Sequence, residues 1–411
     1  MKLAFKYHPR WNEQQLQIIE ELSFHTTKLY NIANHLCRET YKNYRTLEKA
    51  FKQNWHTSYL HSHTYQQTLK ILEQNWKSYF QSVKDHQNNP SKYKAMPQPP
   101  KYKHIQHRKN EVIFTNLAIR RRNGHIQLSL SKSMRETFQV DSLKVEEPNT
   151  LPLPEHAHIQ QMRLQYDHLQ KNWYLLIIYS IPPKAQSPSK HIMSIDIGLN
   201  NLAAITFTHS KNNYIIDGRS VKSINGYINK TIAKLQSIRM KQVGSQAFKT
   251  TKQIQRLRKK RHDIITNHFH KASRAIIQLA EQYEIGTIVI GDLKGIKQQN
   301  PIKTFVQIPI ARFTQMIDYK AELSGIQVRY QKETYTSGVS ALDLEPITKA
   351  YYNKNRRICR GLFQTNRGLR INADINGSLN ILRKAYTGTP KLIATVRDNG
   401  CVNHPQRIRV A

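Results

Sequence analysis

The second half of the chain alternates short apolar segments with helical ones, and this order limits the folds that it can adopt. "HIMSIDIGLNNLAAITFT" (191–208) predicts two strands joined by a polar turn, and "NNYIIDG" (212–218) predicts a third. A helical region extends from about Ser223 to Tyr283. After it come the strand "IVIGDL" (288–293), the helix "FTQMIDYKAELSG" (313–325), the strand "IQVRYQKETY" (326–335) and the helix "NADINGSLNILRKAY" (372–386). These segments predict an α/β domain.

Hairpin strands come first and strand–helix–strand units later, which is the order of an RNase H-like sheet. This domain is expected to cover residues 186–411, after the linker "PPKAQSPSK". Residues 11–96 carry apolar residues at helical spacing and end in a Pro-rich segment, which predicts a helical domain. Residues 97–185 contain two hairpin patterns, one around Asn123-Gly124. With residues 1–10, which include the strand pattern "KLAFKY", they predict a small β-barrel-like domain.

Lys and Arg outnumber Asp and Glu by 64 to 27, which gives a formal net charge of +37. A charge of this size opposes compaction unless a polyanion neutralises it, so nucleic acid is the expected partner. The alternatives are a basic surface that only aids solubility and a membrane-surface protein. Solubility needs only about 2–8 net charges. The sequence also has no run of about 18 apolar residues and no signal-peptide core, so we expect a cytoplasmic protein.

Two basic segments are candidates for contact with a nucleic acid backbone. Arg120, Arg121 and Arg122 lie at the predicted hairpin turn, where they form either a solvated tip or phosphate contacts. Lys249–Arg261 holds seven Lys and Arg residues and no acid. A run of one sign repels itself and lacks partners four residues away, which favours nucleic acid over a solvated helix face. The candidates in this run are Lys252, Arg256, Arg258, Lys259, Lys260 and Arg261.

Two acids are candidates for chemistry. Asp196 lies between Ile195 and Ile197 in an apolar strand, which is costly unless the acid serves a metal, a base or a hydrogen-bond network. Asp374 lies near the start of the closing helix, where the small residues Gly377 and Ser378 let that helix approach another element. For Asp374 the alternative is an acid favoured only by the helix dipole.

The segments "IDIGLNN", "IVIGDL", "FVQIP…YKAELSGIQV…ETYTS" and "NADINGSLNILRK", within residues 194–384, resemble the RuvC-type nuclease domain of the transposon-encoded TnpB family. Members of that family are RNA-guided relatives of compact type V CRISPR effectors. The resemblance implies a three-carboxylate site that binds two Mg²⁺ or Mn²⁺ ions for phosphodiester hydrolysis. Asp196 and Asp374 match its first and third acids. It also implies that 11–96 is a recognition domain and that 1–10 and 97–185 form a wedge domain.

The chain departs from the family pattern in two places. The usual CxxC…CxxC zinc insertion contains only Cys359 here, so we expect no zinc. The usual strand-end glutamate is Gly291, and Asp292 cannot simply replace it because successive strand side chains point to opposite faces. Glu333 ends the next strand, which should run parallel beside this one, about 4.8 Å away. We therefore expect Glu333 to be the missing carboxylate, relocated from position 291; a surface acid is the alternative.

Three functions remain open from the sequence. The first is a transposon-encoded, RNA-guided DNA endonuclease, bound to a noncoding RNA from the element's end and to target double-stranded DNA beside a short flanking motif. The second is a nuclease-dead, RNA-guided DNA-binding protein that acts like a repressor. The third is a transposase or resolvase that acts without RNA. We expect the protein in the bacterial cytoplasm, at the nucleoid when it is bound to DNA.

Overall fold

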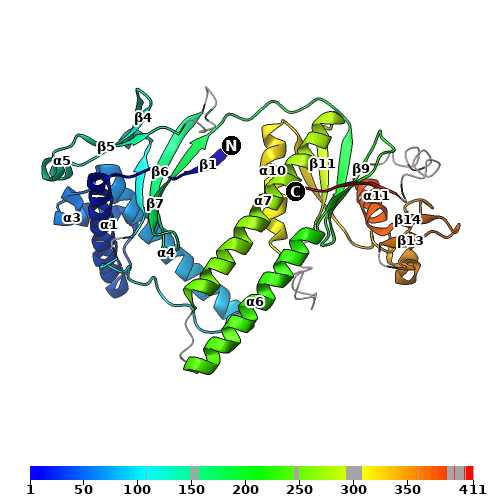
Figure 1. The fold of residues 1–411 in the computed structure, drawn as a ribbon, viewed down its shortest axis with the longest axis horizontal. Coiled ribbons are helices and arrows are strands. Elements are labelled where there is room, and N and C mark those ends of the chain that lie inside the picture. Colours follow the sequence, from blue (N-terminus) through cyan, green and yellow to red (C-terminus); the bar gives the residue numbers. More distant parts are fainter. Residues whose placement is uncertain are drawn as a thin grey trace. The chain divides into compact units, whose positions relative to one another are not determined.

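The computed structural model describes residues 1–107, 109–148, 153, 157–244, 250–292, 308–359, 361–386, 393, 402 and 404–410. The chain forms two compact units, Met1–Pro182 and Pro183–Ala411. Figure 1 shows their helices and strands. In the described residues, none of the helices is long and apolar enough to cross a membrane.

The first unit joins helices to two antiparallel sheets, in the orders β1-β7-β6-β2 and β3-β4-β5. The N-terminal strand β1 pairs with β7, as expected for a strand of the β-domain. Both predicted hairpins are confirmed, β6–β7 and β3–β4. The elements are β1 (Lys2–Tyr7), α1 (Glu13–Glu39), α2 (Tyr44–Phe51), α3 (Trp55–Ser58), α4 (Ser62–Asn88), β2 (Val112–Thr115), β3 (Ile119–Arg122), β4 (His125–Ser129), α5 (Lys132–Phe138), β5 (Ser142–Glu146), β6 (His158–Asp167) and β7 (Asn172–Ser180).

Local sequence explains where several of these elements begin and turn. Asn12 and Gln15 form a reciprocal capping box at the start of α1. Asn123 and Gly124 have φ values of 51° and 70°, the left-handed backbone that a two-residue hairpin requires. The run expected as one strand before this turn is broken at Asn116–Ala118 into β2 and β3, which lie in different sheets.

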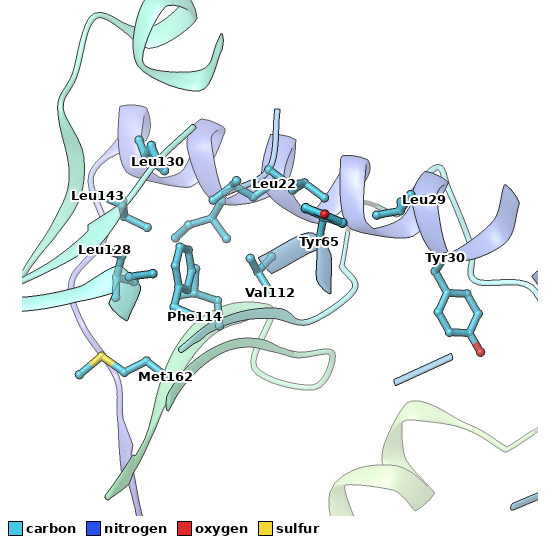
Figure 2. Packing of buried hydrophobic residues seen from close by; sticks show 14 of the residues in the cluster. Leu22, Leu29, Tyr30, Tyr65, Val112, Phe114, Leu128, Leu130, Leu143 and Met162 are labelled. Atoms are coloured by element: carbon cyan, nitrogen blue, oxygen red, sulfur yellow. The ribbon is translucent and has the colours of Figure 1, made fainter. Parts of the chain in front are cut away.

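One hydrophobic core runs through the whole first unit (Figure 2). Leu22 and Leu29 of α1 belong to the same buried cluster as Phe114, Leu128 and other strand residues. The helical part 11–96 and the β part therefore share a core, although the sequence suggested separate domains.

The second unit contains a six-stranded sheet in the order β12-β11-β8-β9-β10-β15. The first three strands in sequence are antiparallel, and β11 and β12 are parallel to β8, as the sequence predicts. The C-terminal strand β15, parallel to β10, was not predicted. The elements are β8 (Ile192–Asp196), β9 (Asn201–Phe207), β10 (Tyr214–Asp217), α6 (Arg219–Val243), α7 (Lys252–Gln282), β11 (Thr287–Asp292), α10 (Ile310–Leu323), β12 (Gln327–Lys332), β13 (Leu362–Gln364), β14 (Arg370–Asn372), α11 (Ala373–Ala385) and β15 (Gln406–Ile408).

The two faces of this sheet carry different helices. Ile195 and Ile290 pack with Phe269 of α7 and Phe313 of α10. The opposite face packs on α11, with Leu379 and Ala204 in another buried cluster. Because side chains alternate along a strand, Asp196 and Gly291 face α11.

Candidate functional site

Asp196 is the last residue of β8 and is partly buried against α11. Buried hydroxyls fix this helix on the sheet: Ser194 Oγ lies 3.0 Å from Ser378 Oγ and 2.7 Å from Thr206 Oγ1. The adjacent Gly377 lies directly under the carboxylate. A Cβ at position 377 would lie 3.2 Å from Asp196 Cγ and closer still to Oδ2, so any side chain there would displace the acid.

Gly291 is paired in register with Gln331 of β12, and Glu333 lies two residues further along the same face. The Glu333 side chain fills the space that a side chain at 291 would occupy. A Cβ added to Gly291 would lie 2.7 Å from Glu333 Cδ and 2.9 Å from Cγ. The glycine therefore leaves room for a carboxylate that reaches over from the neighbouring strand.

Asp292 belongs to the other face of the sheet. It is paired with Lys332. Alternation along β11 places its side chain on the same face as Ile288 and Ile290, which pack with α7 and α10. Its charge is nevertheless close enough to Glu333 to affect the pKa of that carboxyl group.

The electrostatics of these acids are strongly perturbed. Burial raises the pKa of Asp196 well above its ordinary value, and the charges of Glu333 and Asp374 raise it further, while Arg357 opposes them. Burial, together with the charge of Asp292, raises the pKa of Glu333 to about 7, while the charge of Lys384 opposes them. Glu333 Oε1 is buried and has no hydrogen-bond partner among the described residues. Such a group is costly unless a ligand or ion satisfies it.

Asp374 lies in the first turn of α11, whose N-terminus the Asn372 side chain caps. Asn201 Nδ2 donates to Asp374 Oδ2 at 2.6 Å, and Arg357 Nη2 lies 3.9 Å from Oδ1. Arg407 of β15 donates to Asn201 Oδ1 at 2.9 Å. Because arginine can only donate, this contact turns the amide of Asn201 so that its NH₂ faces Asp374.

Asn201, Arg357 and Arg407 were not predicted from the sequence as partners of this site. Asn201 is the last residue of the quoted "IDIGLNN", which was the one available signal for it. Nothing in the sequence pointed to Arg357 or Arg407, which reach the site from segments far along the chain.

The three carboxylates do not form a ready-made metal site. Among the residues that the structure describes, no group of three or more His, Cys, Asp and Glu side chains is close enough to hold one ion. The donor chemistry nevertheless fits Mg²⁺ or Mn²⁺, because Asp196, Glu333 and Asp374 offer only hard oxygens. The unpartnered Glu333 Oε1 and the raised pKa values of Asp196 and Glu333 are both features that a divalent cation would relieve.

The basic candidates lie on exposed positions with two exceptions. Arg120, Arg121 and Arg122 are all exposed on β3, although Arg121 pairs with Glu147. In α7, Lys259 is partly buried and lies 3.5 Å from Asp263, and Arg261 is partly buried. Arg261 donates from Nε to Asn225 of α6 at 2.6 Å. The exposed members of α7 are Lys252, Arg256, Arg258 and Lys260. Lys249, which begins the basic run, lies outside the described residues.

Two family profiles and a solved structure match large parts of the chain. Residues 176–297 match the family profile OrfB_IS605, described as a probable transposase. Residues 311–381 match the Cas12f1-like TNB domain. In fold, 90% of the chain superposes on 83% of a solved chain titled "Cryo-EM structure of the Cas12f1-sgRNA-target DNA complex", with a TM-score of 0.60 and 13% identity. The chain therefore shares its mixed α/β fold with that solved chain.

Three relatives share part of the sequence. One is "CRISPR-associated endodeoxyribonuclease Cas12f2" of a Micrarchaeota archaeon, 28% identical over 53% of this chain and 41% of the relative. Another is "CRISPR-associated endodeoxyribonuclease Cas12f1" of Sulfoacidibacillus thermotolerans, 26% identical over 57% of this chain and 55% of the relative. The third is "TnpB-like protein ORF457" of Acidianus two-tailed virus, 26% identical over 49% of this chain and 43% of the relative. These matches support a TnpB/Cas12f-type family for the chain. It spans about half the length of these relatives.

Proposed function

We propose that this protein is an RNA-guided DNA endonuclease of a transposable element, with one of its three catalytic carboxylates relocated from position 291 to Glu333. The observation that carries the proposal is the Glu333 carboxyl group, which fills the space above Gly291 on the sheet face that bears Asp196. Two relatives are named endodeoxyribonucleases, and a solved chain of similar fold is titled as a complex with a guide RNA and target DNA.

In this proposal Asp196, Glu333 and Asp374 hold two Mg²⁺ or Mn²⁺ ions and no zinc. The ions supply a water of lowered pKa and stabilise the leaving oxygen of a phosphodiester. The chain's own contribution is to place and orient the acids. Gly377 and Gly291 make room for Asp196 and Glu333, and Asn201 engages Oδ2 of Asp374.

The basic surfaces provide the nucleic acid contacts in this proposal. A noncoding RNA from the transposon end neutralises much of the +37 charge, and its guide segment supplies sequence specificity by base pairing. Residues 11–96 act as the recognition domain, 1–10 and 97–185 as the wedge domain, and 186–411 as the nuclease domain. The exposed arginines of β3 and the basic start of α7 contact phosphates.

The test is cleavage of a matched plasmid library by protein that has been co-purified with the element's RNA, in the presence of Mg²⁺. Glu333→Ala should abolish cutting and leave guide and target binding intact. Asp292→Ala is the matched control. It removes the carboxylate of the residue that follows Gly291, whose side chain faces the other side of the sheet. The assignment is wrong if Glu333→Ala cuts normally and Asp292→Ala does not.

A second candidate is a nuclease-dead RNA-guided DNA-binding protein. It is favoured by one observation: the described residues contain no preassembled group of three metal-binding side chains. Guide-dependent binding without cutting under every metal condition would establish it. Sequencing the co-purified RNA separates both candidates from a transposase that acts without RNA.

A further inference from the structure

Glu333 lies in an unusual place for a residue that must hold its carboxylate still. The strand β12 ends at Lys332, so Glu333 is one residue beyond the last register pair, Asp292–Lys332. A glutamate within a strand has its backbone fixed by the hydrogen-bond ladder on either side. Among the residues that the structure describes, Glu333 has no register partner on β11, so we ask which other contacts hold its backbone.

Lys384, in the last turn of α11, contacts the chain on both sides of Glu333. Its Nζ donates to the carbonyl oxygen of Thr334 at 2.6 Å and to that of Lys332 at 3.1 Å. These two carbonyls bracket Glu333. One side chain therefore ties the peptide groups around the glutamate to the helix that carries Asp374.

The same helix also holds the turn that follows. Glu333 O accepts from Thr336 N at 3.0 Å and from Thr336 Oγ1 at 2.8 Å. Thr336 O in turn accepts from the buried Asn380 of α11 at 2.9 Å. Lys384 and Asn380 are four residues apart, on one side of the helix. Together they support the Glu333 backbone from before and after, in place of the missing strand pairing.

We infer that Lys384 is a positioning residue for the relocated carboxylate: it fixes the Glu333 backbone relative to α11 and so sets how Glu333 meets a divalent cation shared with Asp196 and Asp374. This inference rests on the proposed function. Lys384 lies beyond both segments that match family profiles, 176–297 and 311–381.

Two simpler roles for Lys384 predict different behaviour. A lysine that acts only through its charge repels a divalent cation and also lowers the pKa of Glu333. The assay is therefore run at about pH 8.5, where Glu333 is ionised with or without that charge, and there the removal of the charge would tighten metal binding. A lysine that only contacts nucleic acid would weaken RNA or DNA binding when removed and leave the metal affinity unchanged. A positioning role predicts the third result, a weaker metal affinity with unchanged RNA binding.

The experiment measures Mn²⁺ binding to the guide-RNA-bound protein by the loss of the free-Mn²⁺ EPR signal. The difference between the wild type and Glu333→Ala isolates the ions that depend on this site from those held by RNA. Lys384→Met keeps the length of the side chain and removes its donors, while Lys384→Arg keeps donors and charge. Lys332→Met is the matched control, because it removes an exposed lysine next to Glu333 that faces the other side of the sheet.

Lys384→Met should weaken the Glu333-dependent Mn²⁺ affinity by about tenfold, as changes to groups that orient metal ligands commonly do. Cleavage should then need about tenfold more metal, and guide RNA affinity should stay constant. Lys384→Arg should recover most of the affinity, and Lys332→Met should match the wild type. Unchanged or tighter Mn²⁺ binding in Lys384→Met overturns the inference, as does an equal loss in Lys332→Met. If the wild type and Glu333→Ala bind Mn²⁺ alike, the proposed function itself fails and the inference with it.

Discussion

Replacing Glu333 with glutamine should stabilise the metal-free protein above neutral pH, although it removes a carboxylate that we assign to the active site. The pKa of Glu333 is raised from its ordinary value near 4.5 to about 7. An acid whose pKa is raised on folding adds to the free energy of unfolding when it is protonated. For Glu333 this contribution is fully present below about pH 4.5 and is lost as pH rises through about 7. A difference of about 2.5 pKa units corresponds to about 3 kcal/mol. Glutamine does not ionise, so it avoids this cost.

The assay is hydrogen exchange of peptides from β11, β12 and α11, measured in EDTA between about pH 5 and 8 with intrinsic exchange rates corrected for pH. All four tryptophans, Trp11, Trp55, Trp76 and Trp173, lie in the first unit, so tryptophan fluorescence reports that unit separately. Relative to the wild type, Glu333→Gln should gain up to about 3 kcal/mol of protection in these peptides near pH 8 and almost none near pH 5.

The exposed Glu322 of α10 offers a control, since Glu322→Gln removes a carboxylate of the same unit without changing the site. In saturating Mg²⁺ the wild type should be the more stable of the two proteins, because the ion stabilises the wild type and not Glu333→Gln. If Glu333→Gln has the same pH slope as the wild type in EDTA, the burial argument is refuted.

Three further changes test neighbouring parts of the site and the basic surface. Gly291→Ala should reduce cleavage at least about a hundredfold, because its Cβ would overlap the Glu333 carboxylate; wild-type rates would contradict the packing. Gly377→Ala should cause a similar loss by displacing Asp196 while guide RNA binding, measured by filter retention, stays unchanged. Arg258→Gln should lower the slope of log affinity against log salt by about one for nucleic acid, and an unchanged slope would remove this residue from the contact surface.

Alternation and strand order were enough to predict that Glu333 lies beside Gly291 on the neighbouring parallel strand. In a strand, positions 291 and 292 must face opposite sides, so Asp292 could be set aside from the sequence alone. The parallel neighbour followed from the order of strands and helices, and it placed a glutamate near the vacant position. The structure gives β11 and β12 the parallel register that this reasoning required. Short-range patterns therefore carried information about contacts across the sheet.

The polar supports of the site could not be predicted in this way. Lys384 reads as an ordinary basic residue at the end of a helix, and its contacts lie 50 and 52 residues earlier in the chain. Arg407 meets Asn201 across 206 residues, from a strand of three residues that has no clear pattern. Side-chain contacts of this kind depend on the tertiary arrangement, and no local periodicity encodes them. The shared core of the first unit has the same explanation. The apolar face of a helix or strand does not indicate which other element it packs against.

The most direct test of a relocated carboxylate is to locate the metal ions in the guide RNA–target DNA complex by anomalous scattering from Mn²⁺. We expect an ion with an oxygen of Glu333 and an oxygen of Asp196 in its coordination sphere, at about 2.1 Å. We also expect that Asp292 ligates no ion. An ion held by Asp292, or an ion at Asp196 with the Glu333 carboxylate turned away from it, would contradict the account.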